Sequence, residues 1–277
     1  MADPSNNNLS RVRGLILDMD GVLWEGNSPL PGMDAFFNFL RAQNIRFILA
    51  TNNASLTPAQ YVQKITRLGA HVLPEEILTS ALATAQYLKT IAQPGDSIFV
   101  IGEDGIRCAV TDAGFRLASE DDLHAPFVIC GMDRQLSWQK LATATINLRN
   151  GARFIGTNPD TTFPTERGIA HGNGAILSAL TTASGVQPVI IGKPHAPLFE
   201  MALARLGMPK DAVAAVGDRL ETDILGAERA GISSILVLTG VTNPSALESS
   251  EIRPTWVFPD LPGLQRAWNQ TLADFRR

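Results

Sequence analysis

The sequence lacks the features that would assign it to several large classes of protein. Its 277 residues carry a formal net charge of −4, so no excess of Lys and Arg indicates nucleic acid as a partner. No apolar run approaches the ~20 residues that a membrane-spanning helix needs. The first residues also lack the apolar core of a secretion signal. We therefore expect neither a nucleic-acid partner nor a membrane partner.

Cysteine is scarce as well, with Cys108 and Cys130 as the two residues of this type. Two cysteines do not build a disulfide scaffold, and a reducing compartment is the simpler interpretation. We expect both thiols to be buried in the core and the protein to be cytoplasmic. The sequence does not determine the oligomeric state, and a homodimer is the candidate that we name.

What the sequence does contain is a regular alternation of strand-like and helix-like segments. The short apolar run at 14–18 is followed by apolar residues at helical spacing, and the run at 46–51 by a helix that Thr57-Pro58 opens. The far end repeats this pattern, with predicted strands at 188–192, 212–216, 234–238 and 255–258 and helices at 222–230 and from Leu261. Such alternation predicts an α/β fold, with a Rossmann-like parallel sheet core and helices on both faces.

The middle of the chain has an alternation of its own. It predicts strands at 97–101, 127–130 and 153–156 and helices near 80–91, 104–113, 137–149 and 174–183. This is enough for a second, smaller α/β domain of roughly 100 residues. We predict a disordered lead-in at 1–12, a catalytic core at 13–80 and 188–277, and an inserted cap domain at 81–187.

The most informative segment is Asp18-Met-Asp-Gly-Val22, directly after an apolar strand. Ligands of open α/β sheets bind beyond the carboxyl ends of the strands, which is where Asp18 and Asp20 are expected. Two carboxylates so close together repel each other without a cation, and they offer hard oxygen ligands to Mg²⁺. An aspartate can also attack phosphorus, while a neighbouring carboxyl transfers the proton. Asp and Gly are equally common in surface turns, so the segment alone leaves both interpretations open.

Three further segments follow predicted strands in the same way. Thr51 comes after the second strand, where its hydroxyl and nearby backbone amides could bind a phosphoryl oxygen, although Thr-Asn-Asn is also a common turn. Lys193 follows a third strand and could neutralise a phosphoryl group, or be a solvated surface charge. Asp218 and Asp223 follow a fourth strand and could complete a metal site, or cap a helix.

Together these four motifs, in this order, resemble those of the haloacid dehalogenase (HAD) superfamily. The segments Gly156-Thr-Asn-Pro-Asp160 and Leu238-Thr-Gly-Val241 resemble its NagD-like and p-nitrophenylphosphatase-like subfamily, which carries the larger, C2 type of cap. The resemblance runs from about Arg13 to Asp260, nearly the whole chain.

The resemblance implies a Mg²⁺-dependent phosphatase that acts on small phosphorylated metabolites, and on p-nitrophenyl phosphate, through an aspartyl-phosphate intermediate. Asp18 would be the nucleophile and Asp20 the acid and base. Thr51 and Asn52 would bind phosphate, and Lys193 would also orient Asp18. Mg²⁺ would be held by Asp18, the Asp20 carbonyl and Asp218, with Asp223 in support.

Selectivity is expected in the cap, because the core motifs contain little that could recognise a leaving group. Arg134 could contact a second anionic group of the substrate, and Asn158 and Asp160 could bind sugar hydroxyls. Asn-Pro-Asp is also a common turn, and Arg134 could be a solvated charge.

Other functions use the same chemistry. A phosphotransferase or mutase would pass the phosphoryl group to a hydroxyl other than water. A non-catalytic sensor of phosphorylated ligands would be expected to have lost Asp18 or Asp20, and both are present. A response-regulator receiver is a single domain without a comparable insertion. Dehalogenation is disfavoured, because it needs neither the acid nor the metal site.

Overall fold

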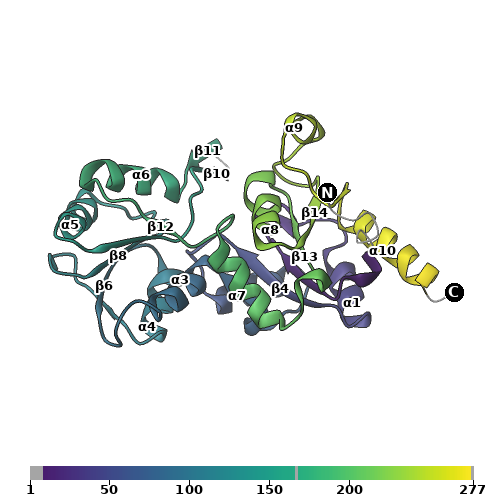
Figure 1. Ribbon diagram of the computed structural model, residues 1–277, viewed down its shortest axis with the longest axis horizontal. Coiled ribbons are helices and arrows are strands. Elements are labelled where there is room, and N and C mark those ends of the chain that lie inside the picture. Colours follow the sequence, from purple (N-terminus) through teal and green to yellow (C-terminus); the bar gives the residue numbers. More distant parts are fainter. Residues whose placement is uncertain (1–8, 166–167, 276–277) are drawn as a thin grey trace. The chain divides into compact units, whose positions relative to one another are not determined.

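The computed structural model describes residues 9–165 and 168–275 (Figure 1). The chain divides into two compact units. The first comprises Met1–Ala50, Val62–Ile77 and Phe199–Arg277, and the second comprises Thr51–Tyr61 and Leu78–Leu198. The second unit is thus an insertion into the first. The domain boundaries predicted from the sequence, with the cap at 81–187, stay a prediction.

A six-stranded sheet forms the centre of the first unit, in the order β15-β14-β13-β1-β4-β5. Neighbouring strands from β15 to β4 run parallel. Leu17 of β1 pairs with Leu49 of β4 and Val216 of β13, so these three strands end at the same edge of the sheet. The strands are β1 (Gly14–Leu17), β4 (Arg46–Thr51), β5 (Ile77–Thr79), β13 (Val213–Gly217), β14 (Ser233–Val237) and β15 (Trp256–Phe258).

Helices lie on both faces of this sheet (Figure 1). The helices that belong to this unit in whole or in part are α1 (Met33–Ala42), α2 (Pro58–Arg67), α7 (Ala196–Leu206), α8 (Leu225–Ala230), α9 (Pro244–Ser249) and α10 (Leu261–Phe275). A short hairpin of β2 (Trp24–Glu25) and β3 (Ser28–Pro29) follows β1.

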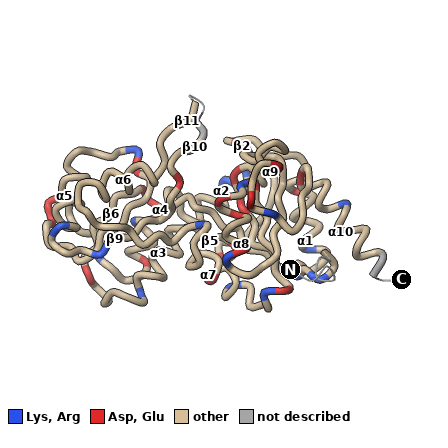
Figure 2. The backbone as a smooth tube through the Cα atoms, turned by 45° about the horizontal axis from the view of Figure 1, so that its top comes forward, with Lys and Arg blue, Asp and Glu red and all other residues tan. Residues whose placement is uncertain are grey.

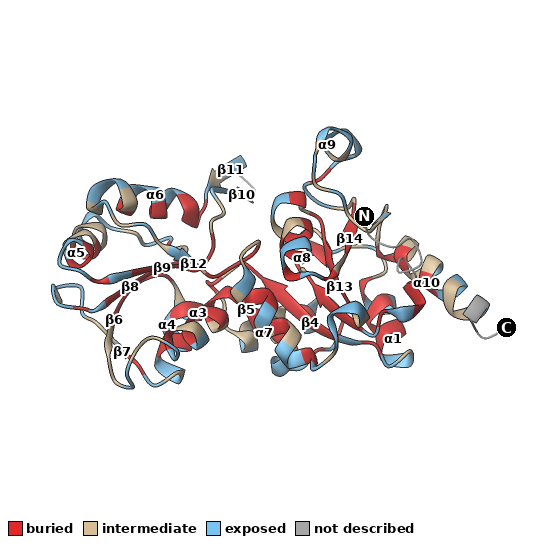
Figure 3. Ribbon diagram, in the orientation of Figure 1, coloured by how far each residue is buried: buried red, intermediate tan, exposed pale blue. Residues whose placement is uncertain are grey.

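The degree of burial of each strand explains how apolar its sequence is. Every residue of β1 and of β13 is buried, which suits strands that are continuous apolar runs without alternation (Figure 3). At the edge, β15 is only partly buried. Helix α1 buries an apolar face, and its Phe39 ring meets the Trp268 indole of α10 edge-on at 5.8 Å between centroids. The core of the first unit therefore lies between the sheet and these helices.

The second unit has its own parallel sheet, in the order β12-β9-β8-β6-β7. Its strands are β6 (Ser97–Ile101), β7 (Arg116–Leu117), β8 (Phe127–Cys130), β9 (Arg153–Gly156) and β12 (Val189–Ile190). Its helices are α3 (Ser80–Leu88), α4 (Asp104–Asp112), α5 (Trp138–Arg149) and α6 (Asn173–Ser184). An antiparallel hairpin of β10 (Thr162–Thr165) and β11 (Gly168–His171) precedes α6.

The predicted fold class, a parallel α/β sheet core with an additional smaller α/β unit, is confirmed. Three details differ from the sequence analysis. The strand predicted at 188–192 pairs with β9 of the second unit, not with the larger sheet. The helix predicted at 222–230 begins as a π-helix, η5 (Leu220–Ile224). The lead-in predicted at 1–12 lies outside the described residues up to position 8, and Leu9–Arg11 form a 3₁₀-helix.

The two thiols differ in their environment. Cys130 is buried at the end of β8, as predicted, and burial raises the pKa of its thiol, with the Asp133 charge adding to the shift. The prediction for Cys108 was wrong, because this residue is exposed on α4. The buried face of α4 is formed by Gly105, Ile106, Ala109 and Val110, so position 108 falls on its solvent side.

The distribution of charge and the apolar length of the helices bear on possible partners. Figure 2 shows basic and acidic positions dispersed over both units among the residues drawn in colour. None of the helices in the described ranges has the length and apolar character that crossing a membrane requires.

The burial of β1 makes a prediction about stability. Leu15 is completely buried in the centre of the sheet, so Leu15→Ala should lower the free energy of unfolding by about 2–5 kcal/mol. Val257 in the edge strand is 41% exposed, so Val257→Ala should cost less than about 1 kcal/mol. Urea unfolding measures both. Equal losses would contradict the central position of β1.

Candidate active site

Three aspartates of the first unit come together beyond the carboxyl edge of the sheet. Asp18 follows β1, Asp218 follows β13, and Asp223 lies in η5. Each offers a carboxylate oxygen, and these oxygens all lie within 4.8 Å of one another. The pairing of β1 with β13 brings Asp18 and Asp218 together, since the Asp18 amide also donates to the Val216 carbonyl at 2.9 Å.

Hydrogen bonds hold the two buried carboxylates in place. The amide of Val241 donates to Asp218 Oδ2 at 2.7 Å. Asp223 Oδ2 accepts from the amide of Arg219 at 3.2 Å and from the hydroxyl of Thr222 at 3.3 Å. Asp218 is 1% exposed and Asp223 is 2% exposed. The side chains are therefore fixed before any ligand binds.

Two glycines make room for the Asp218 carboxylate. Gly21 has φ +81°, in the left-handed region, and a Cβ there would lie 2.6 Å from Asp218 Oδ2. A Cβ on Gly240 would lie 2.0 Å from the same oxygen. The Thr239 hydroxyl, next to Gly240, donates to the carbonyl of Gly21 at 2.6 Å. The loops after β1 and β14 thus close around Asp218 because neither carries a side chain at the contact.

This arrangement fits a hard divalent cation. Three carboxylates at this spacing, two of them buried, repel one another unless a positive charge is among them. Oxygen atoms are the ligands that Mg²⁺ prefers. Asp223 was predicted to support the metal site, and its carboxylate lies within 4.8 Å of those of Asp18 and Asp218.

The side chain of Asp20 points elsewhere. It is exposed, and its Oδ1 accepts a hydrogen bond of 2.7 Å from the indole nitrogen of Trp24. The Lys64 ammonium lies over the Trp24 ring, 4.4 Å from the centroid. Burial lowers the pKa of Lys64, and the charge of Asp20 opposes that shift. The carboxylate of Asp20 thus remains outside the metal cluster, so its predicted ligation involves its carbonyl alone.

In the second unit, Thr51, Asn52 and Lys193 are all buried, with exposures of 3%, 8% and 4%. The side-chain amide of Asn52 both accepts a hydrogen bond from the backbone of Lys193 and donates one to it. Its Oδ1 accepts from the Lys193 amide at 2.7 Å, and its Nδ2 donates to the Lys193 carbonyl at 3.0 Å. Thr51 Oγ1 accepts from the Asn53 amide at 3.0 Å. Two motifs that are 141 residues apart are therefore joined by one side chain.

The predicted cap residues Asn158 and Asp160 belong to the same network. Asn52 Nδ2 donates to both carboxylate oxygens of Asp160, at 3.2 and 3.3 Å. Asn158 is buried, and its Nδ2 donates to the Asn52 carbonyl at 2.8 Å. Asn173, at the start of α6, supports this loop by donating to the Asn158 carbonyl at 2.8 Å. Asn158 thus holds backbone in place, while Asp160 is half-buried beside Asn52.

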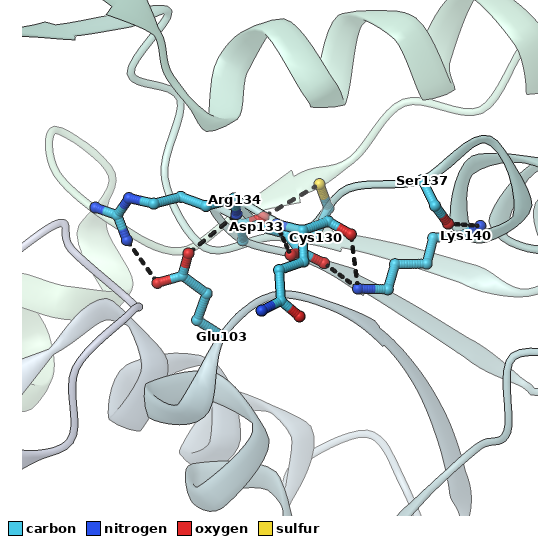
Figure 4. A network of polar contacts seen from close by, with 8 residues as sticks. Glu103, Cys130, Asp133, Arg134, Ser137 and Lys140 are labelled. Atoms are coloured by element: carbon cyan, nitrogen blue, oxygen red, sulfur yellow. Dashed lines mark hydrogen bonds and ion pairs between the residues drawn. The ribbon is translucent and has the colours of Figure 1, made fainter.

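Arg134 lies on the surface of the second unit, after β8. Its guanidinium forms an ion pair of 2.7 Å with Glu103, and its amide donates to the same carboxylate at 3.0 Å (Figure 4). The neighbouring Asp133 is buried and pairs with Lys140 at 2.9 Å. An anionic ligand would have to compete with Glu103 for Arg134.

Three residues of these networks, Trp24, Lys64 and Asn173, were not predicted from the sequence. Trp24 stands four residues after Asp20 in a turn with glycine, and this spacing could have indicated a contact. Lys64 is distant in sequence, and its position depends on how α2 packs. Asn173 directly precedes the helix predicted at 174–183, and its contacts with Cys130 and Asn158 carry no local signal.

The family comparisons agree with the motifs. A model described as haloacid dehalogenase-like hydrolase matches residues 15–116, and a second, HAD hydrolase-like model matches residues 190–264. The acid sugar phosphatase of Staphylococcus epidermidis is 39% identical over 253 residues, which is 91% of this chain and 96% of that protein.

Solved structures are similar over nearly the whole chain. The 4-nitrophenylphosphatase of Thermotoga maritima superposes with a TM-score of 0.88 at 36% identity, covering 93% of this chain and 98% of that one. The glycerol phosphate phosphatase of Mycobacterium tuberculosis, in complex with magnesium, gives 0.87 at 33% identity, covering 95% and 79%. The resemblance predicted from four short motifs is therefore confirmed, and the chain belongs to the haloacid dehalogenase-like hydrolases, in their p-nitrophenylphosphatase-like branch of phosphatases.

Proposed function

We propose that this chain hydrolyses phosphate monoesters of small sugars and polyols, with Mg²⁺ as cofactor and Asp18 as nucleophile. The observation that carries the proposal is the cluster of Asp18, Asp218 and Asp223 at the ends of two adjacent parallel strands. The substrate class is supported by two relatives, one an acid sugar phosphatase and one a glycerol phosphate phosphatase.

The roles of the chain's own residues follow from their chemistry. Asp18 Oδ attacks phosphorus, and the bond to the leaving oxygen breaks. Asp20 donates a proton to that oxygen and later takes one from the water that hydrolyses the aspartyl phosphate. The Thr51 hydroxyl and the Lys193 ammonium bind the phosphoryl oxygens. Mg²⁺, when bound by Asp18, Asp218 and the Asp20 carbonyl, offsets negative charge on the phosphoryl group.

We propose a supporting role for the residues around Asn52. Its amide holds the backbone of Lys193 through two hydrogen bonds, and Asp160 holds the amide. Asn52 and Asn158 thus act by positioning Lys193 and Thr51. Asp160 and Arg134 remain the candidates for contacts with the sugar or polyol part of the substrate.

We also propose that the protein acts in the cytoplasm. Both cysteines are unpaired and Cys108 is exposed, which suits a reducing compartment. A homodimer stays a prediction, which light scattering after gel filtration would test.

The central expectation is activity that depends on a divalent cation. The protein should hydrolyse p-nitrophenyl phosphate and sugar phosphates with Mg²⁺, and EDTA should abolish turnover until Mg²⁺ is added in excess. The reason is that the aspartate cluster repels an anionic ester unless a cation is bound. A screen of phosphorylated metabolites by kcat/KM would identify the preferred ester, and full activity in metal-free buffer would refute the proposal.

The contact between Gly240 and Asp218 yields a second prediction. In Gly240→Ala the new methyl group would displace the Asp218 carboxylate, so the Mg²⁺ concentration for half-maximal activity should rise by about 10-fold or more. Gly231→Ala is the control, since its Cβ has Lys210 Nζ at 4.0 Å as nearest neighbour and its φ of +70° brings only backbone strain. The control should lower the Tm but leave Mg²⁺ activation unchanged. The same Mg²⁺ dependence in both variants would contradict the metal site.

The bonds of Asn52 yield a third prediction. Asn52→Ala removes both bonds to the Lys193 backbone, so kcat should fall by about 10²-fold because the ammonium loses its position. Asn147→Ala is a matched control, since Asn147 is also buried and also makes two bonds to loop backbone, at 3.0 and 2.7 Å. Both variants should lose stability, and only Asn52→Ala should lose kcat. If kcat fell equally in both variants, Asn52 would have a structural role only.

A further inference from the structure

The indole of Trp24 occupies an unusual position next to Asp20. The side chain is completely buried, yet its nitrogen reaches the exposed carboxylate and donates to Oδ1 at 2.7 Å. The main chain closes the same turn, since the Gly21 amide donates to the Trp24 carbonyl at 2.8 Å. A short isolated bridge joins Asp20 and Trp24 as well. The turn from Asp20 to Trp24 is therefore closed by both backbone and side chain.

Lys64 of α2 completes the surroundings of the indole. Its ammonium lies 4.4 Å from the centroid of the Trp24 ring, a distance typical of a cation–π contact. The ring is thus held by a cation on its face and by an anion at its N–H edge. Since Lys64 is half-buried, its contact with the ring is sheltered from solvent.

The two oxygens of the Asp20 carboxylate differ in their hydrogen bonding. Within the described residues, the bond from Trp24 is the one that this carboxylate accepts, and it engages Oδ1. Oδ2 keeps its lone pairs for a proton. A charged acceptor makes the bond stronger than a neutral pair, and it restricts a side chain that is otherwise exposed and able to rotate.

We propose that Trp24 is a positioning residue for proton transfer by Asp20. The indole N–H holds Oδ1, so that Oδ2–H faces the leaving oxygen and gives its proton as the P–O bond breaks. In the second step Oδ2 takes a proton from the water that attacks the aspartyl phosphate. Lys64 keeps the indole in place. This inference rests on the proposed function, in which Asp20 is the acid and base.

The test uses esters that differ in their need for a proton. Nitrophenolate leaves without protonation, whereas the alkoxide of glycerol phosphate requires it. In Trp24→Phe, kcat/KM for glycerol phosphate should fall by about 10-fold or more, because general acid catalysis of this kind contributes about 10²–10⁴-fold. For p-nitrophenyl phosphate kcat/KM should change by less than about 2-fold, since it reports only the steps up to the aspartyl phosphate. Its kcat should fall, because the base step is slowed.

Three further variants separate the explanations. Trp268→Phe removes another completely buried indole, and it should change stability without any dependence on the ester. Lys64→Met keeps the apolar stem and should give the same ester dependence as Trp24→Phe, but weaker. It therefore tests the inference even if Trp24→Phe does not fold. Asp20→Asn should give the same pattern in a stronger form.

The outcomes are distinguishable. Ester-dependent losses in Asp20→Asn and in Trp24→Phe or Lys64→Met support the inference. If Asp20→Asn shows the ester dependence while Trp24→Phe and Lys64→Met lose activity equally on both esters, the inference is overturned and the proposed role of Asp20 stands. If Asp20→Asn itself shows no ester dependence, the acid role of Asp20 fails and the inference fails with it.

Discussion

The close approach of three carboxylates is the constraint on which the rest of the first unit depends. Asp18, Asp218 and Asp223 place oxygens within 4.8 Å of one another, an arrangement that repels itself in the absence of a cation. Parallel pairing of β1 with β13 brings the first two together, and the π-helical turn of η5 brings the third. Gly21 and Gly240 leave the space in which the loops around Asp218 meet. The fold thus holds repelling charges together, and a Mg²⁺ ion bound there, as we propose, would offset the repulsion.

In the second unit, hydrogen bonds to side-chain amides hold the loops in place. Asn52 joins the loop after β4 to the backbone of Lys193, and Asp160 and Asn158 are tied to it in turn. Because these groups are buried, each missing bond would leave a polar atom without compensation. The positions of Thr51 and Lys193 are therefore fixed by polar contacts as much as by apolar packing.

The sequence predicted the fold class and the aspartates of the cluster because their signals are local. A buried parallel strand such as β1 is a short apolar run, and Asp18 and Asp218 directly follow such runs. Contacts between distant segments had no comparable signal. Phosphate binding by Asn52 stays a prediction, and the bonds of its side chain to Lys193 had no signal in the sequence. The strand predicted at 188–192 was assigned to the larger sheet, whereas β12 pairs with β9, because a short apolar run does not show which sheet it joins. The contact of Lys64 with Trp24 depends on the packing of α2 and could not be read from spacing.

The roles proposed for the other residues all depend on covalent catalysis by Asp18. The most direct measurement is an acid quench during turnover of p-nitrophenyl phosphate, followed by peptide mapping of the protein by mass spectrometry. We expect phosphate on the peptide that contains Asp18, and none in Asp18→Asn treated in the same way. Phosphate on another residue, or an Asp18→Asn variant that still becomes phosphorylated and turns over, would contradict it.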